Sequence, residues 1–192
     1  MRVISGKAKG RRLKAVPGET TRPIMDRVKE NLFNLLGNFV AGTRWLDLFA
    51  GTGQVGIEAL SRGAAEVVFV DNTRAAIQTI HANLAITGLA PGARVVQMDA
   101  FRYLRGEPAA PFDLIYVAPP QYKGLWVDAV KIVDQRPLRQ SIGRYLTPNG
   151  IVVVQIDPKE YVPLELQSLA LYDLRRYGNT QLCFYERADR EE

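Results

Sequence analysis

The run from Asp47 to Gly56 combines residue types that could hold a nucleotide-like ligand. It joins the end of an apolar stretch to a Gly-x-Gly-x-x-Gly turn formed by Gly51, Gly53 and Gly56. Glycines lack a Cβ atom, so the backbone can turn tightly and a ligand can approach it closely. A lone glycine pattern of this kind is weak evidence, and its meaning depends on the acidic residues around it.

Acidic residues end three successive apolar segments. A carboxylate at Asp47 would repel a pyrophosphate over the turn but suits a ligand with an ammonium group. Asp71 can accept both ribose hydroxyl hydrogens, and Asp99 can accept from an adenine amino group. Helix capping is the alternative role of both residues. The set favours S-adenosylmethionine, with these expected contacts: Asp47, Phe49, Ala50, Gly51, Gly53, Asp71, Asn72, Asp99 and Ala100.

Basic residues gather at the start of the chain, whose formal net charge is +5. Six of the first fourteen residues are lysine or arginine: Arg2, Lys7, Lys9, Arg11, Arg12 and Lys14. Such a cluster predicts a surface that contacts nucleic-acid phosphates, and a merely solvated basic terminus is the alternative. Glycines and alternating apolar residues in the same segment favour a short hairpin. We expect residues 1–20 to form a basic extension and 21–192 to form one catalytic domain.

The remaining chain alternates between strand-like and helix-like segments, which is typical of a doubly wound α/β fold. A first helix is expected to open at Thr21-Arg22-Pro23 and run to about Phe39. Strands are expected near 44–50, 66–71, 93–98, 112–117 and 150–156, and helices near 54–62, 73–87, 99–105 and 124–145. Two last strands, 169–177 and 181–186, flank the hairpin turn Gly178-Asn179. A parallel sheet that ends in an antiparallel hairpin is the arrangement of class I methyltransferases.

A rigid polar loop follows the strand expected at 112–117. Two prolines fix its backbone and remove two amide donors, so the preceding carbonyl points into the site. Enzymes that methylate an exocyclic amino group use a carboxylate or amide, then Pro-Pro and an aromatic residue that stacks on the base. Here alanine and glutamine occupy the two variable positions. The candidate catalytic residues are Ala118, Pro119, Pro120, Gln121 and Tyr122.

Nearly the whole chain resembles the bacterial 16S rRNA (guanine-N(2))-methyltransferases of the small ribosomal subunit. The motifs are Arg2-Val-Ile-Ser-Gly-Lys, Gly10-Arg-Arg-Leu, Arg22-Pro23, Asp26-Arg-Val-Lys-Glu30, Leu32-Phe-Asn34, Asp47 to Arg62 with Gly63-Ala64, and Tyr177-Gly-Asn-Thr180. The resemblance implies a Rossmann-like class I fold with a mostly parallel seven-stranded sheet and S-adenosylmethionine as cofactor. It also implies an RNA contact at Arg22, besides Lys7, Lys9, Arg11 and Arg12.

The resembled family carries Asp-Pro-Pro-aromatic where this chain has Ala118-Pro-Pro-Gln. We therefore expect methyl transfer to a guanine amino group of 16S rRNA, without a metal, by a slower or rewired enzyme. The partner would be 16S rRNA or an assembling small subunit. The alternatives are an impaired RNA- and S-adenosylmethionine-binding assembly factor, or a methyltransferase for another nucleic-acid acceptor.

The cysteine content and the length of the apolar runs indicate where the protein acts. Cys183 is the only cysteine, so an internal disulfide is excluded and a reducing compartment is favoured. No apolar run approaches the roughly 20 residues that a membrane-spanning helix needs. We expect a cytoplasmic monomer.

Overall fold

The computed structural model describes residues 1–18, 24–135 and 145–188. These residues divide into two compact units, Met1–Ala100 and Phe101–Glu192. No helix within the described part of the chain is both long and apolar enough to cross a membrane.

The first unit contains three parallel strands in the order β3-β2-β1: Ala93–Gln97, Glu66–Asp71 and Arg44–Asp47. Helices α2 (Gln54–Ser61) and α3 (Arg74–Thr87) connect them, with the 3₁₀ turn η2 (Ala90–Gly92) before β3. Parallel neighbours need such crossover helices. The carboxyl ends of all three strands therefore meet at one edge of the sheet, where ligands of open α/β sheets bind.

Helix α1 (Asp26–Leu36) and the 3₁₀ turn η1 (Gly37–Val40) precede the sheet. Val28, Leu32 and Phe33 are buried on one face of α1, as the helical spacing predicts. The predicted helix start is wrong, because the helix begins at Asp26 and its N-cap residue is Met25. The predicted capping residues Thr21 to Pro23 lie outside the described residues.

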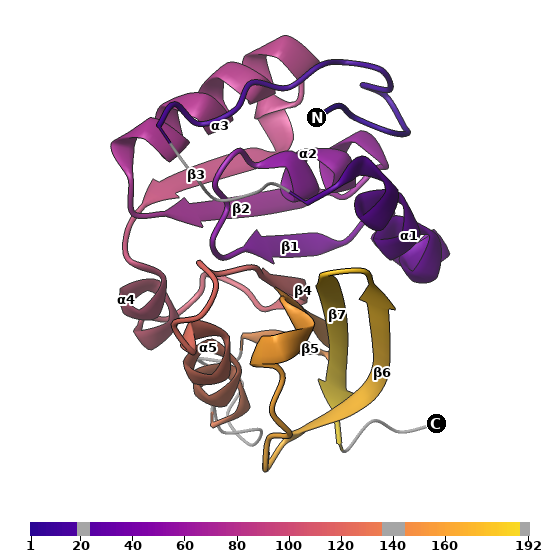
Figure 1. The fold of residues 1–192 in the computed structure, drawn as a ribbon. Helices are drawn as coiled ribbons and strands as arrows, with labels where there is room; N and C mark the ends of the chain where they lie inside the picture. Colours follow the sequence, from indigo (N-terminus) through magenta and orange to yellow (C-terminus); the bar gives the residue numbers. More distant parts are fainter. Residues whose placement is uncertain (19–23, 136–144, 189–192) are drawn as a thin grey trace. The chain divides into compact units, whose positions relative to one another are not determined.

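The first sixteen residues form a segment that we call the N-terminal arm. Figure 1 shows this arm, in indigo, running along α2 and α3 of the same unit. The predicted hairpin is reduced to a loop that a single antiparallel bridge closes, between Arg2 and Arg12. A longer ladder does not form because the amides of residues 4, 5, 7 and 8 donate to α2 instead of to an opposing strand.

The second unit contains four strands in the order β4-β5-β7-β6: Phe112–Val117, Leu146–Ile156, Thr180–Arg187 and Leu169–Tyr177. β4 and β5 are parallel, whereas β7 runs antiparallel to both β5 and β6. Helix α5 (Leu125–Asp134) follows β4, and the 3₁₀ turn η3 (Pro158–Glu160) follows β5. Helix α4 (Ala100–Arg105) begins at the boundary between the units. Gly178 turns the last hairpin at a φ of 61°.

The predicted fold class is confirmed by the seven-stranded, mostly parallel sheet with its C-terminal antiparallel hairpin. The predicted helix over 124–145 is wrong at its end, because α5 stops at Asp134 and Tyr145 already leads into β5. Residues 136–144 lie outside the described part. β1 is also shorter than predicted, since it ends at Asp47 and not near residue 50.

Candidate functional site

The glycine turn lies between β1 and α2, and Gly51 and Gly56 have different roles in it. Gly51 and Gly53 adopt left-handed φ values of 52° and 74°. A Cβ atom at Gly51 would contact nothing within 4 Å, so the space beside this residue is open to a ligand. A Cβ atom at Gly56 would lie 2.4 Å from the Phe69 ring. Gly56 therefore lets α2 pack closely on β2, as the motif predicts.

Asp47 lies beneath this turn with only 3% of its surface exposed. Its Oδ2 accepts a hydrogen bond of 3.2 Å from the Gly56 amide, in the first turn of α2. Burial raises the pKa of Asp47 to about 7, against the opposing effect of the Gly56 bond, and the nearby Asp71 charge raises it further. A cationic ligand group close to Asp47 would favour its ionised form.

Asp71 joins the glycine turn to the end of β2. Its Oδ2 accepts from the Gly51 amide at 3.0 Å, and its Oδ1 accepts from the Thr73 amide and hydroxyl. Thr73 is itself the N-cap of α3 and accepts from Ala76. Thr73, and not Asp71, therefore caps α3, whereas Asp71 accepts from Thr73 outside the helix and is itself partly exposed at the sheet edge.

The remaining predicted cofactor residues also lie in this unit, after the ends of β1, β2 and β3. Asn72 and Asp99 are exposed, Phe49 is partly exposed, and Ala50 and Ala100 are buried. An open turn with two accessible carboxylates at one sheet edge suits a nucleoside that carries amino and hydroxyl donors. The residues present thus fit S-adenosylmethionine.

Asn83 on α3 is a residue that the sequence reasoning missed. It is fully buried, and its Nδ2 donates to the carbonyls of Thr52 (2.9 Å) and Lys14 (3.1 Å). Its Oδ1 accepts from the Lys14 amide at 2.7 Å. One side chain therefore ties the N-terminal arm to the glycine turn. A polar residue among the buried positions of an apolar helix face was the available signal.

Residues 118–122 form a loop after β4 in the second unit. Pro119 is buried, Ala118 is partly buried, and Pro120, Gln121 and Tyr122 are exposed. The loop follows the carboxyl end of a parallel strand, where α/β folds place their reactive groups. Residues 120–122 of the motif are therefore accessible to solvent, and the two prolines restrict its backbone.

Tyr122 is held in an unusual conformation. Its φ of 60° is the only left-handed value of a non-glycine residue in the described ranges, and 64% of its surface is exposed. Its hydroxyl donates to Asp157 Oδ2 at 2.8 Å and its amide to Glu160 Oε1 at 2.6 Å. These two carboxylates form the capping box of η3. Strain of this kind persists only where neighbours impose it, and it is concentrated at functional sites.

The electrostatics of this contact keep the phenol as a donor. The hydrogen bond to Asp157 raises the pKa of Tyr122, and the negative charges of Asp157 and Glu160 act in the same direction. The Lys159 amide lowers the pKa of Asp157, and the Tyr122 hydroxyl lowers it further. The pair is therefore a phenol and a carboxylate at neutral pH.

The predicted RNA contacts of the arm are on its surface. Lys7, Lys9, Arg11 and Arg12 are all exposed, whereas Arg22 lies outside the described residues. Two other charged residues, Lys29 and Glu58, form a buried ion pair with an Nζ–Oε2 distance of 3.2 Å. Sequence reasoning missed this pair, although each residue interrupts an apolar helix face.

Comparisons with known proteins identify the family of this chain. A sequence model of the family described as "Conserved hypothetical protein 95" matches residues 1–186. The chain is 38% identical over 189 residues to the Bacillus subtilis (strain 168) protein named "Putative rRNA methyltransferase YlbH", covering 97% of this chain and 99% of that protein. It is 30% identical over 187 residues to Ribosomal RNA small subunit methyltransferase D of Escherichia coli (strain K12), covering 97% and 90%.

A solved structure gives the same result for the fold. The structure described as "Putative methyltransferase yhhF from Escherichia coli" has a TM-score of 0.80 and 33% sequence identity, with 97% of each chain covered. The family resemblance that the sequence motifs indicated is confirmed, and the chain belongs to the Conserved hypothetical protein 95 family of these methyltransferases.

Proposed function

We propose that the protein transfers a methyl group from S-adenosylmethionine to the exocyclic amino group of a guanine in 16S rRNA. The observation that carries this proposal is the glycine turn, which Asp71 holds at a sheet edge and which is open beside Gly51. The relatives' names support an rRNA substrate. The protein would act in the cytoplasm as a monomer.

The first unit would bind the cofactor. Asp71 would accept from the ribose hydroxyls, Asp99 and the Ala100 amide would contact the adenine, and Asp47 would balance the positive charge of the methionine part. Asn72, Phe49, Ala50, Gly51 and Gly53 would line the rest of the site. The bound cofactor supplies an electrophilic methyl group on a sulfonium sulfur.

The second unit would hold the base through residues 118–122. The Ala118 carbonyl would accept from the guanine amino group and so orient its lone pair, and Pro119 and Pro120 would keep that carbonyl fixed. Gln121 can offer an amide oxygen, and the exposed Tyr122 ring offers a surface on which a base can stack. No ionised side chain stands at the position of the family's aspartate.

The substrate would be 16S rRNA or an assembling small subunit. The four exposed cations of the arm, together with Arg22, would contact its phosphates. The test is to incubate the protein with a labelled methyl donor and unmodified small-subunit RNA or particles, and then to map the label. Label on a guanine amino group supports the proposal; label on another base or none contradicts it.

The alanine at position 118 is the observation that favours a second candidate function. A family member without the motif carboxylate could bind RNA and cofactor as an assembly factor without turnover. We expect Ala118→Asp to raise the methylation rate about ten- to a hundredfold, because a charge-assisted hydrogen bond contributes about 1.5–3 kcal/mol. Measurable activity in the parent protein supports the enzyme. Activity only in Ala118→Asp would support the assembly factor.

A further inference from the structure

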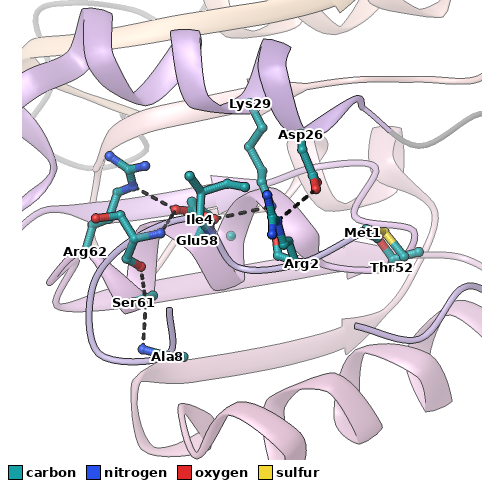
Figure 2. Close-up of polar contacts among 12 residues, drawn as sticks. Met1, Arg2, Ile4, Ala8, Asp26, Lys29, Thr52, Glu58, Ser61 and Arg62 are labelled. Atoms are coloured by element: carbon teal, nitrogen blue, oxygen red, sulfur yellow. Dashed lines mark hydrogen bonds and ion pairs between the residues drawn. The ribbon is translucent and has the colours of Figure 1, made fainter. Parts of the chain in front are cut away.

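The N-terminal arm is seated on the carboxyl-terminal half of α2. Ile4 and Ser5 donate their amides to Glu58 at 2.8 and 3.0 Å. Lys7 donates to the Ser61 carbonyl at 2.8 Å, and Ala8 donates to the Ser61 hydroxyl at 2.9 Å. Figure 2 shows the arm residues Ile4 and Ala8 meeting the α2 residues Glu58 and Ser61.

Glu58 holds the arm through a fully buried carboxylate. Besides the two arm amides, it accepts from Arg62 Nε at 2.8 Å and pairs with Lys29 Nζ at 3.2 Å. Lys29 in turn donates to the Arg2 carbonyl at 2.6 Å. Burial lowers the pKa of Lys29, and the Glu58 charge opposes that change. A buried acid with four donors fixes the loop backbone far more firmly than an exposed contact would.

Gly6 shows how closely the arm approaches the helix. Its φ is 82°, and a Cβ atom at this position would lie 1.8 Å from the Ser61 carbonyl oxygen. Gly10, at the other end of the same loop, has a φ of 83°, yet a Cβ atom there would meet nothing within 4 Å. The two glycines therefore share a backbone conformation and differ in contact with α2.

We propose that the arm is a rigid RNA-docking element whose shape is set by α2, with Glu58 and Ser61 as positioning residues. The contacts with α2 fix the backbone of this loop and leave the side chains of Lys7, Lys9, Arg11 and Arg12 exposed. RNA then meets cations whose backbone is already ordered, so binding loses less conformational entropy than binding to a flexible basic tail. This inference rests on the proposed function, because it takes RNA as the partner.

The matched pair Gly6→Ala and Gly10→Ala tests whether the contact of the arm with Glu58 and Ser61 of α2 matters for RNA binding. Both variants place a side chain at the same left-handed φ, but only Gly6→Ala forces the loop away from Ser61. With unmodified small-subunit RNA as probe, we expect Gly6→Ala to bind roughly tenfold more weakly than the parent and Gly10→Ala to stay within about threefold. The salt dependence of binding should also become shallower in Gly6→Ala alone.

Two further measurements separate positioning from general damage. Calorimetric binding of S-adenosylhomocysteine should be unchanged in Gly6→Ala, and in the methylation assay the KM for RNA should rise while kcat stays constant. Ser61→Ala removes the hydroxyl contacts to Ser5 and Ala8 without adding bulk, and should weaken RNA binding roughly three- to tenfold. It decides the matter if Gly6→Ala does not fold.

Equal RNA affinity of Gly6→Ala and Gly10→Ala would overturn the inference, as would unchanged affinity of Ser61→Ala. If Gly6→Ala lost cofactor binding and RNA binding together, the inference would also be overturned, because the contact between the arm and α2 would then only support the fold. The proposed function fails separately: it fails when the parent protein binds RNA but places no methyl group on guanine, and the binding comparison remains readable.

Discussion

At the scale of single residues, the raised pKa of Asp47 makes the stability of the fold depend on pH. Its pKa of about 7 in the folded state lies above the ordinary value of 3.8, so the folded protein holds the proton more tightly than the unfolded chain. Its contribution to stability is present at low pH and is lost as pH rises from about 4 to 7. A shift of this size corresponds to about 4 kcal/mol.

Asp47→Asn should remove this pH dependence. We expect the variant to match the parent near pH 4 and to exceed its unfolding free energy by up to about 4 kcal/mol above pH 7. The affinity for S-adenosylmethionine should rise with pH through about 7 in the parent but stay flat and lower in Asp47→Asn. Denaturant titrations between pH 4 and 8 measure the stability, and calorimetry over the same range measures the affinity. A parent affinity that is independent of pH would contradict this role.

Tyr122 and Asp157 should act as one unit. Tyr122→Phe keeps the ring and loses the hydroxyl bond, so we expect kcat for methylation to fall roughly three- to tenfold with unchanged RNA affinity. Asp157→Ala should lower kcat at least as much, because it also removes the bond from Lys159.

The double variant should be no slower than Asp157→Ala alone, since the two changes remove the same contact. Tyr172→Phe, at an exposed tyrosine of β6, is the control for the loss of a hydroxyl. Fully additive losses in the double variant would show that the two residues work independently.

At the scale of elements, the packing of α2 on β2 depends on the absence of one side chain. Gly56→Ala would place a Cβ atom 2.4 Å from the Phe69 ring, in a backbone conformation that alanine otherwise accepts. We expect a loss of about 1–3 kcal/mol in unfolding free energy. Adding Phe69→Leu should recover part of it, and denaturant unfolding of both single variants and the double variant gives the coupling. A fully stable Gly56→Ala protein would contradict this packing.

The elements of the sheet could be predicted because their signals are local. Alternating apolar segments, the glycine turn and Gly178-Asn179 each act within a few residues, and they predicted the parallel strands and the final hairpin. The arm could not be predicted in the same way. Ile4 and Glu58 are 54 residues apart in sequence, so nothing local indicates that the arm amides leave their own hairpin for α2.

The candidate site divides along the same line. The acids at strand ends were found because a carboxylate after an apolar segment is visible in sequence. Asn83 and Asp157 were not found, because their roles depend on which distant backbone they meet. The left-handed backbone of Tyr122 was also hidden, since tyrosine carries no preference for it.

At the scale of the whole molecule, the net charge of +5 and the basic arm predict salt-sensitive RNA binding. Each neutralised phosphate contributes roughly 0.7–0.9 to the slope of log affinity against log salt. We expect the double variant Arg11→Gln/Arg12→Gln to reduce that slope by about 1.5 in filter-binding or anisotropy titrations. Arg105→Gln/Lys131→Gln changes the same charge at exposed positions outside the arm and should leave the slope unchanged. Equal effects of both pairs would mean that charge acts without a defined docking surface.

Asn83 restricts how this protein can diverge. Both hydrogens of its amide and its oxygen are engaged, by Lys14 and Thr52 together. Aspartate would replace the donating Nδ2 by an oxygen, which would face the carbonyls of Lys14 and Thr52 and repel them. Serine is too short to reach both partners. Residues 14 and 52 offer only main-chain atoms to Asn83, so their own side chains can change freely, whereas replacing Asn83 leaves buried main-chain groups without partners. The restriction therefore falls on one side chain of α3, which alone serves two segments that a long stretch of chain separates.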